Sequence, residues 1–156
     1  MSLGDAATGC LITTAYLFFH LVVTAKNRWK KELTFIVIFG VAGWLLDGLL
    51  VVMGLQTFQA SSFAPIWLLF LWFNYMTSIH YSMPQVFKNV PLTLFIGFIF
   101  GPWTYLGCVK LNLVQFSSSL WMCLLQGVVW MLWMILYRHV VVSKMFWDEP
   151  AAHQIN

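Results

Sequence analysis

The sequence has very little charge. Only 8% of its 156 residues are Asp, Glu, Lys or Arg, whereas 61% are hydrophobic and the mean hydropathy is +0.82. Ordinary soluble domains are about 25% charged, so this composition excludes a soluble globular domain and indicates a polytopic membrane protein. The net charge of +3 is explained by basic residues between the hydrophobic segments, and nothing suggests nucleic acid as a partner.

The sequence also lacks the motifs of common catalytic and cofactor sites. It contains no nucleophile elbow, P-loop, dinucleotide fingerprint, HExxH or paired-carboxylate pattern. Its three cysteines, Cys10, Cys108 and Cys123, form no CxxC pair, and their apolar neighbours favour small packing residues over a disulfide or redox centre. We therefore expect no metal and no cofactor, and no motif points to a particular enzymatic reaction.

Five hydrophobic segments are long enough to cross a hydrocarbon core of roughly 30 Å, which takes about 20 helical residues. Strands are excluded, because lipid leaves open sheet edges unsatisfied and the alternation typical of membrane barrels does not occur. The sequence therefore predicts an all-α polytopic transmembrane helical bundle, a single domain over 1–156 with a cytoplasmic tail at 138–156. The predicted spans are approximately 7–25, 33–55, 66–83, 92–109 and 119–137.

The positions of Lys and Arg predict the orientation of these five spans. If the connector at 26–32 is cytoplasmic, seven of the eight basic residues lie inside and only Lys110 lies outside. The positive-inside rule then places the N-terminus outside and the C-terminus inside. Because the first segment lacks a preceding basic region and is followed by the basic cluster, we expect a retained helix and not a cleaved signal peptide.

Asp47 is the most informative residue of the predicted spans, because it lies in the middle of an otherwise apolar stretch. A charged side chain at membrane depth costs roughly 2.5 to 3.5 kcal/mol on insertion scales, so it is expected to have a partner inside the bundle. Gly40, Gly43 and Gly54 lie on the same helical stripe as Asp47 and predict the close approach of another helix.

Polar residues from other spans fall at a similar depth. At about 1.5 Å per residue, Asp47, Asn74 and Gln126 lie roughly 12 Å from the outer face, and Tyr105 lies near the same level. These four residues are the predicted interior polar layer and the candidate binding site. Each span also has one polar or small-residue stripe, which predicts that all five helices surround a common interior.

Two kinds of hypothesis remain open for Asp47. In the first, its carboxyl bonds Asn74, Gln126 or a neighbouring backbone and holds the helices together. In the second, it is functional, either as a proton or cation relay or as the polar anchor of a lipid or small-molecule pocket.

The histidines are secondary candidates. His20 and His80 lie roughly 20 Å from the outer face on different spans, and two imidazoles at one depth could bind a haem axially. A lone histidine inside a membrane more often bonds a hydroxyl, such as that of Tyr16. Trp67, on the polar face of the third span, and Pro102, which perturbs the fourth helix, complete the secondary candidates.

Three blocks of the sequence are distinctive: GWLLDGLLVVMGLQTF, FAPIWLLFLWFNYMTSIHYS and GPWTYLGCVKLNLVQF. They contain the patterns G-x-x-x-D, A-P-x-W-L and G-P-x-x-Y, and together they resemble an uncharacterised family of bacterial inner-membrane proteins, a domain of unknown function. The resemblance covers about 33–137. The matching positions are Gly43, Asp47, Gly54, Ala64, Pro65, Trp67, Leu68, Leu71, Trp72, His80, Ser82, Gly101, Pro102 and Tyr105. Similar proteins often have one further hydrophobic segment before the first span found here.

The resemblance implies a location in the bacterial inner membrane and no established activity. Similar proteins are often encoded near enzymes that modify fatty-acyl lipids. The leading hypothesis is therefore a non-enzymatic accessory or scaffold in membrane lipid modification, with membrane lipid, a lipid-modifying enzyme or a second copy of the chain as partner. One alternative is a small-solute or proton-coupled transporter with Asp47 as titrating group. The other is a membrane enzyme or haem protein that uses His20 and His80.

Overall fold

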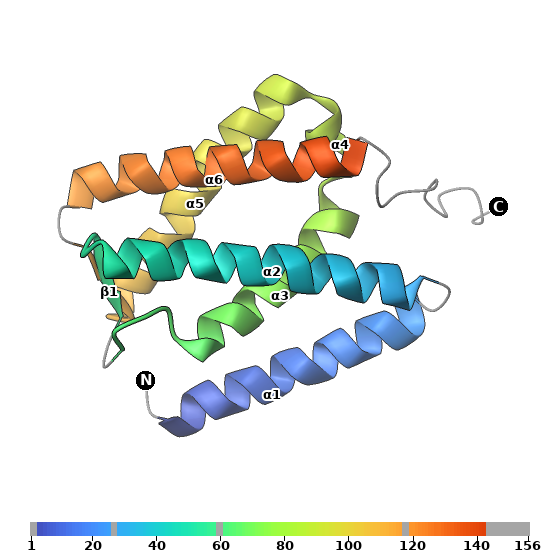
Figure 1. Cartoon of the computed structure of the whole chain (residues 1–156), viewed down its shortest axis with the longest axis horizontal. Helices are drawn as coiled ribbons and strands as arrows, with labels where there is room; N and C mark the ends of the chain where they lie inside the picture. The colour runs from blue at the N-terminus through green and yellow to red at the C-terminus, as the bar shows by residue number, and fades with distance from the viewer. Residues whose placement is uncertain (1–2, 26–27, 59–60, 117–118, 143–156) are drawn as a thin grey trace.

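The computed structural model describes residues 3–25, 28–58, 61–116 and 119–142, which form a helical bundle with one small ribbon of strands (Figure 1). The helices are α1 (Leu3–Phe19), continued by a π-helix η1 (His20–Thr24), α2 (Trp29–Val52), α3 (Ile66–Ser82), α4 (Pro84–Lys88), α5 (Val90–Lys110) and α6 (Ser119–Val142). The strands are β1 (Gln56–Phe58) and β2 (Val114–Phe116), which pair antiparallel.

Four helices in the described part of the chain are long and apolar enough to cross a membrane, so the protein is a multi-pass integral membrane protein. The third predicted span is also an apolar helix, but α3 has 17 residues, fewer than the roughly 20 that a hydrocarbon core takes. Helix α6 continues through Val142, beyond the predicted end of the last span at residue 137. The rest of the predicted tail, 143–156, lies outside the described residues.

The exclusion of strands was wrong for two of the connectors. β1 follows α2, β2 precedes α6, and Thr57 pairs with Gln115 at the centre of the ribbon. Each strand has only three residues, so the ribbon does not cross the membrane. It joins two connectors at one end of the bundle, where their backbone N–H and C=O groups need partners. Strands this short have no recognisable alternation of polar and apolar residues, so the sequence did not reveal them.

Helices α2 and α3 pack closely because α2 presents glycines to large side chains of α3. A Cβ atom at Gly43 would lie 2.5 Å from the ring of Trp72, and Gly40 faces Phe73 in the same way. The predicted close approach of another helix is therefore confirmed at these two positions. The predicted close approach was wrong for Gly54, which follows the end of α2 and has nothing within 4 Å of a Cβ atom. Gly54 has a φ of +70°, a backbone conformation that glycine adopts without strain.

Helix α5 packs on α6 along a second set of glycines. A Cβ atom at Gly97 would lie 2.9 Å from the Cα of Met131, and one at Gly127 would lie 2.8 Å from the carbonyl oxygen of Phe98. Pro102, inside α5, has no N–H to donate to that carbonyl, which lies four residues before it. The carbonyl of Phe98 lies against Gly127 of α6 instead, so Pro102 leaves a carbonyl unbonded within α5 at the contact between these two helices.

Helix α1 lies along one edge of the molecule, against α3 (Figure 1). Only 6% of the residues in its apolar stretch Ala7–Thr24 are buried. The expectation that all five predicted spans surround a common interior was therefore wrong for the first one. Its exposed faces have large apolar side chains such as Leu11 and Phe18, which suit contact with lipid. The buried core comes mainly from α2, α3 and α6, and α5 contributes Tyr105.

The variant Gly97→Ala should destabilise the protein by about 1–3 kcal/mol, because the added methyl group pushes against the backbone of α6. Gly107→Ala is the matched control on the same helix, since nothing lies within 4 Å of a Cβ atom there. We expect a lower thermal unfolding midpoint in detergent for Gly97→Ala only. Equal midpoints for both variants and the wild type would contradict this packing.

Candidate functional site

The carboxylate of Asp47 is buried where α2, α3 and α5 meet. Its Oδ2 accepts a hydrogen bond of 2.7 Å from Nε1 of Trp72, and its Oδ1 accepts one from the hydroxyl of Tyr105. The three residues are 3%, 5% and 4% exposed, respectively. Hydrogen bonds are stronger in such a water-poor environment, and leaving one of these groups unpaired is costly. The structure thus brings Asp47 and Tyr105 of the predicted polar layer into direct contact.

A second polar pair extends from Asp47 to the ribbon. Nε2 of Gln56, on β1, donates to the backbone carbonyl oxygen of Asp47 at 3.2 Å, and Nε2 of Gln126, on α6, donates to Oε1 of Gln56 at 2.9 Å. Both glutamines are fully buried. Gln126 therefore reaches Asp47 through Gln56, and not directly as the sequence suggested.

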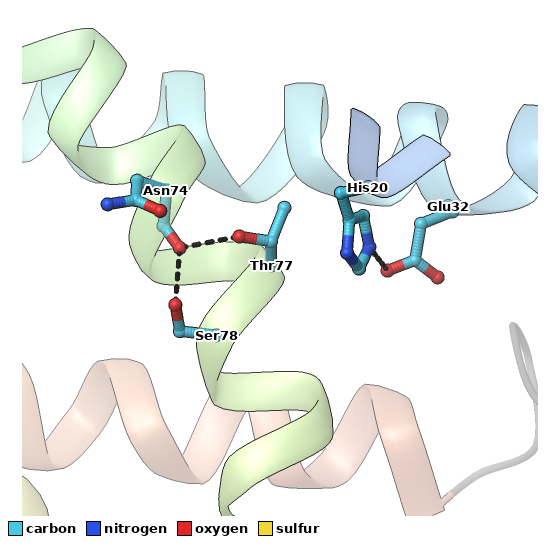
Figure 2. A network of polar contacts seen from close by, with 5 residues as sticks. All are labelled: His20, Glu32, Asn74, Thr77 and Ser78. Carbon is cyan, nitrogen blue, oxygen red and sulfur yellow. Dashed lines mark hydrogen bonds and ion pairs between the residues drawn. The ribbon is translucent and has the colours of Figure 1, made fainter. Parts of the chain in front are cut away.

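Asn74, the fourth residue of the predicted layer, does not bond Asp47. Its backbone carbonyl accepts hydrogen bonds from the hydroxyls of Thr77, at 2.7 Å, and Ser78, at 3.0 Å (Figure 2). Its side-chain amide makes no hydrogen bond with any residue that the structure describes, and it lines a cavity. The predicted layer is therefore divided: Asn74 lines a cavity without joining the buried hydrogen-bond network, whereas Tyr105 belongs to that network and also lines the cavity.

That cavity has a volume of about 300 Å³ and is lined mainly by side chains of α3 and α5. We call it the α3–α5 groove. Its size is at the lower end of the range for small-molecule sites, about 300–1,000 Å³. The described lining residues are mostly aromatic or aliphatic: Phe58, Trp67, Leu68, Leu71, Trp72, Asn74, Tyr75, Ser78, Phe100, Thr104, Tyr105, Cys108, Val114 and Trp130.

The wall of the groove is an aromatic cluster with fixed contacts. The rings of Trp72 and Trp130 stack with centroids 5.0 Å apart, and Tyr75 meets Trp130 edge-on at 5.0 Å. The hydroxyl of Tyr75 donates to Sδ of Met134 at 3.3 Å. Offset and edge-on pairs are the favourable geometries for aromatic rings, so this wall is formed in advance of any ligand. Because Trp72 also bonds Asp47, the buried carboxylate lies directly behind it.

His20 is buried in the hairpin between α1 and α2, away from the ribbon. Its Nε2 lies 3.4 Å from Oε1 of Glu32 (Figure 2). The ring of Tyr16 stacks on the imidazole with the ring centroids 6.2 Å apart. His20 begins the π-helix η1, a distortion that is common at functional sites. The side chain of His80 lies outside the described residues, so the predicted pairing of the two histidines stays a prediction. Within the described chain, no three His, Cys, Asp or Glu side chains gather to hold a metal ion.

Sequence reasoning missed three partners in these networks. Gln56 and Glu32 were placed in connectors, outside the predicted spans. The depth estimate, which used the rise per residue within each span, therefore did not include them. Trp72 was noted only for the resemblance, because tryptophan commonly marks membrane interfaces. A buried indole N–H usually needs an acceptor, and Trp72 lies two residues before Asn74, at the predicted depth of Asp47. That signal was available in the sequence.

Residues 3–136 match the family model described as protein of unknown function (DUF2878). The chain belongs to this family. The predicted membership of an uncharacterised family is thus confirmed, and the match includes all four residues of the predicted polar layer. None of the curated proteins and none of the solved structures gives a significant match.

Tyr105→Phe should destabilise the protein by about 1–3 kcal/mol, because it removes the donor to Oδ1 of Asp47 in a buried site. The effect should be much smaller in an Asp47→Leu background, where no acceptor remains. Thermal unfolding midpoints of the four proteins in this double-mutant cycle would measure the coupling. Tyr16→Phe, at an exposed tyrosine of α1, is the control and should have no effect. Additive changes in the cycle would show that the hydrogen bond contributes nothing.

Proposed function

We propose that this protein is a non-enzymatic accessory of membrane lipid modification that binds a fatty-acyl chain in the α3–α5 groove. The observation that carries the proposal is the groove itself, a mainly aromatic and aliphatic cavity between two helices of a membrane protein. Leu71 and Phe100, which line it, are exposed on the surface of the protein. Acyl chains of the bilayer therefore have access to the groove from the side.

Binding of an acyl chain here would depend on shape. Lipid tails are already in an apolar environment, so entering the groove brings no hydrophobic gain, and the affinity must come from van der Waals packing. The stacked rings of Trp72 and Trp130 provide a preformed surface for such packing. Preformed surfaces bind better because little conformational freedom is lost on binding.

The hydrogen bonding of the buried groups supports a binding role over a catalytic one. The carboxylate of Asp47 accepts from Trp72 and Tyr105 on the protein side of the groove wall. A general acid or base has to come within hydrogen-bonding reach of the atom that reacts. Asp47 is instead enclosed by its two donors, so its evident contribution is to hold the wall of the groove in place.

We further propose that the protein spans a bacterial inner membrane five times, with its N-terminus outside and its C-terminus inside. Helix α1 begins at the end of the bundle that carries the ribbon, whereas α6 ends at the opposite end (Figure 1). Opposite ends are what an odd number of crossings requires. The exposed basic residues Arg28, Lys30 and Lys31 lie in or next to the first turn of α2, far from the ribbon, which favours a cytoplasmic position for that end.

Labelling of single cysteines would test this topology. In a protein whose three native cysteines are replaced by alanine, Thr57→Cys on β1 should react with a membrane-impermeant maleimide added to intact spheroplasts. Lys30→Cys, at the start of α2, should react only after lysis. Both positions are exposed, so a difference between them reports the side of the membrane. Labelling of both from the same side would contradict the proposed orientation.

Native mass spectrometry of the protein, extracted gently from its own membrane, would test acyl binding. The wild type should carry lipid, and Leu71→Trp should lower the bound fraction because it adds bulk inside the groove. Leu132→Trp is the matched control, since Leu132 is an exposed leucine of α6 outside the groove lining. An empty wild type, or equal lipid in the two variants, would contradict the proposal.

Transport is the second candidate function. It is favoured by the chain of buried polar groups that runs from Asp47 through Gln56 to Gln126, between the middle of the bundle and the ribbon. Proton or solute flux in liposomes that is lost in Asp47→Asn would favour transport over the accessory role.

A further inference from the structure

The α3–α5 groove lacks positive charge. None of the lining residues that the structure describes is Lys, Arg or His. Among the described residues, the acidic group that contacts the lining is the carboxyl of Asp47, which is bonded to Trp72 and Tyr105. A phosphate or carboxylate head group drawn into this site would lose its hydration without gaining a cation. The charge pattern therefore disfavours anionic ligands, whichever protonation state Asp47 adopts.

Three hydrogen-bond donors of the groove wall are already engaged within the protein. Nε1 of Trp72 and the hydroxyl of Tyr105 both donate to Asp47. The hydroxyl of Tyr75 donates to Sδ of Met134. These three groups therefore offer no free hydrogen to a ligand in the groove.

For polar recognition the lining keeps the side chains of Asn74, Ser78 and Thr104, beside the indole N–H groups of Trp67 and Trp130 and the thiol of Cys108. The hydroxyls of Ser78 and Thr104 donate to backbone carbonyls within their own helices, so towards the groove they offer acceptor lone pairs. The side-chain amide of Asn74 has no partner among the described residues and offers both a donor and an acceptor. Figure 2 shows that the neighbouring hydroxyls of Thr77 and Ser78 bond the backbone carbonyl of Asn74 and not its side-chain amide.

We infer that the groove selects an uncharged acyl lipid of the diacylglycerol class over an anionic lipid with the same chains, and that the Asn74 amide bonds its polar end. This inference rests on the proposed acyl-binding function. A diacylglycerol has ester carbonyls that accept from Nδ2 of Asn74, and a free hydroxyl that donates to Oδ1 of Asn74 or to the acceptors at Ser78 and Thr104. It has no charge that would need a counterion.

Photo-crosslinking with two matched probes tests the inference. Photoactivatable diacylglycerol and photoactivatable phosphatidic acid with identical chains are each placed, at one mole fraction, in phosphatidylcholine nanodiscs that hold the full chain. The labelled peptides are identified by mass spectrometry. We expect about tenfold more labelling of α3 and α5 by the diacylglycerol probe, the ratio that a difference of about 1.4 kcal/mol in binding free energy produces.

Two variants at Asn74 sharpen the test. Asn74→Leu should remove most of the preference for the diacylglycerol probe, and Asn74→Lys should reverse it, because a cation then faces the groove. Thr14→Leu, on an exposed part of α1 outside the groove, should leave the labelling pattern unchanged. A diacylglycerol preference that survives in Asn74→Leu would overturn the role of Asn74.

The outcomes in the wild type separate the inference from the function on which it rests. Equal labelling of α3 and α5 by the two probes would overturn the selectivity and leave the acyl groove intact. Labelling by neither probe at α3 and α5, with labelling elsewhere on the protein, would overturn the acyl groove as well.

Discussion

The hydrogen bonds from Trp72 and Tyr105 to Asp47 are the contacts on which the rest of the bundle depends, because they join three helices around one buried carboxylate. Such a group is tolerated at membrane depth only when partners replace the water it has lost. Gly43 makes the arrangement possible, since any side chain there would collide with the ring of Trp72. Gly43 and Asp47, one helical turn apart on α2, therefore act together: the glycine makes room for Trp72, and the carboxyl bonds it.

Trp72 also connects the buried carboxyl of Asp47 to the wall of the α3–α5 groove. One part of its indole, the N–H, bonds Asp47, while its ring stacks on Trp130 of α6 and meets Trp133 edge-on at 5.6 Å. The position of the groove wall is thus fixed from behind by the carboxyl group of Asp47, which does not itself line the groove. Because these contacts hold Trp72 in place, the groove keeps its shape without a ligand. Binding that depends on van der Waals packing needs such a preformed shape.

Helical spacing in the sequence was sufficient to place Asp47 inside the bundle, but it could not name all of its partners. Periodicity defines which face of a helix is polar, and rise per residue gives a depth; neither says which helix is the neighbour. Of the four-residue layer, Tyr105 contacts the carboxyl of Asp47 directly, whereas Gln126 reaches Asp47 only through Gln56. Gln56 lies on a three-residue strand, and pairing between two distant connectors leaves no local pattern to recognise.

Helix α1 shows a second limit of prediction from helical spacing: a polar stripe on an apolar helix does not guarantee that the stripe is buried. Among the residues of its apolar stretch, His20 is the buried one, and its partner Glu32 belongs to the first turn of α2. The polar contact that ties α1 to α2 thus lies at the hairpin, while the groove lies between α3 and α5. A change at the His20–Glu32 pair would act first on the seating of α1, whereas a change at Asp47 would act first on the groove wall. Glu32 and Asp47, the acidic residues that are buried in the described part of the chain, therefore serve separate parts of the molecule. Of these two, Asp47 is the one placed to shape the α3–α5 groove.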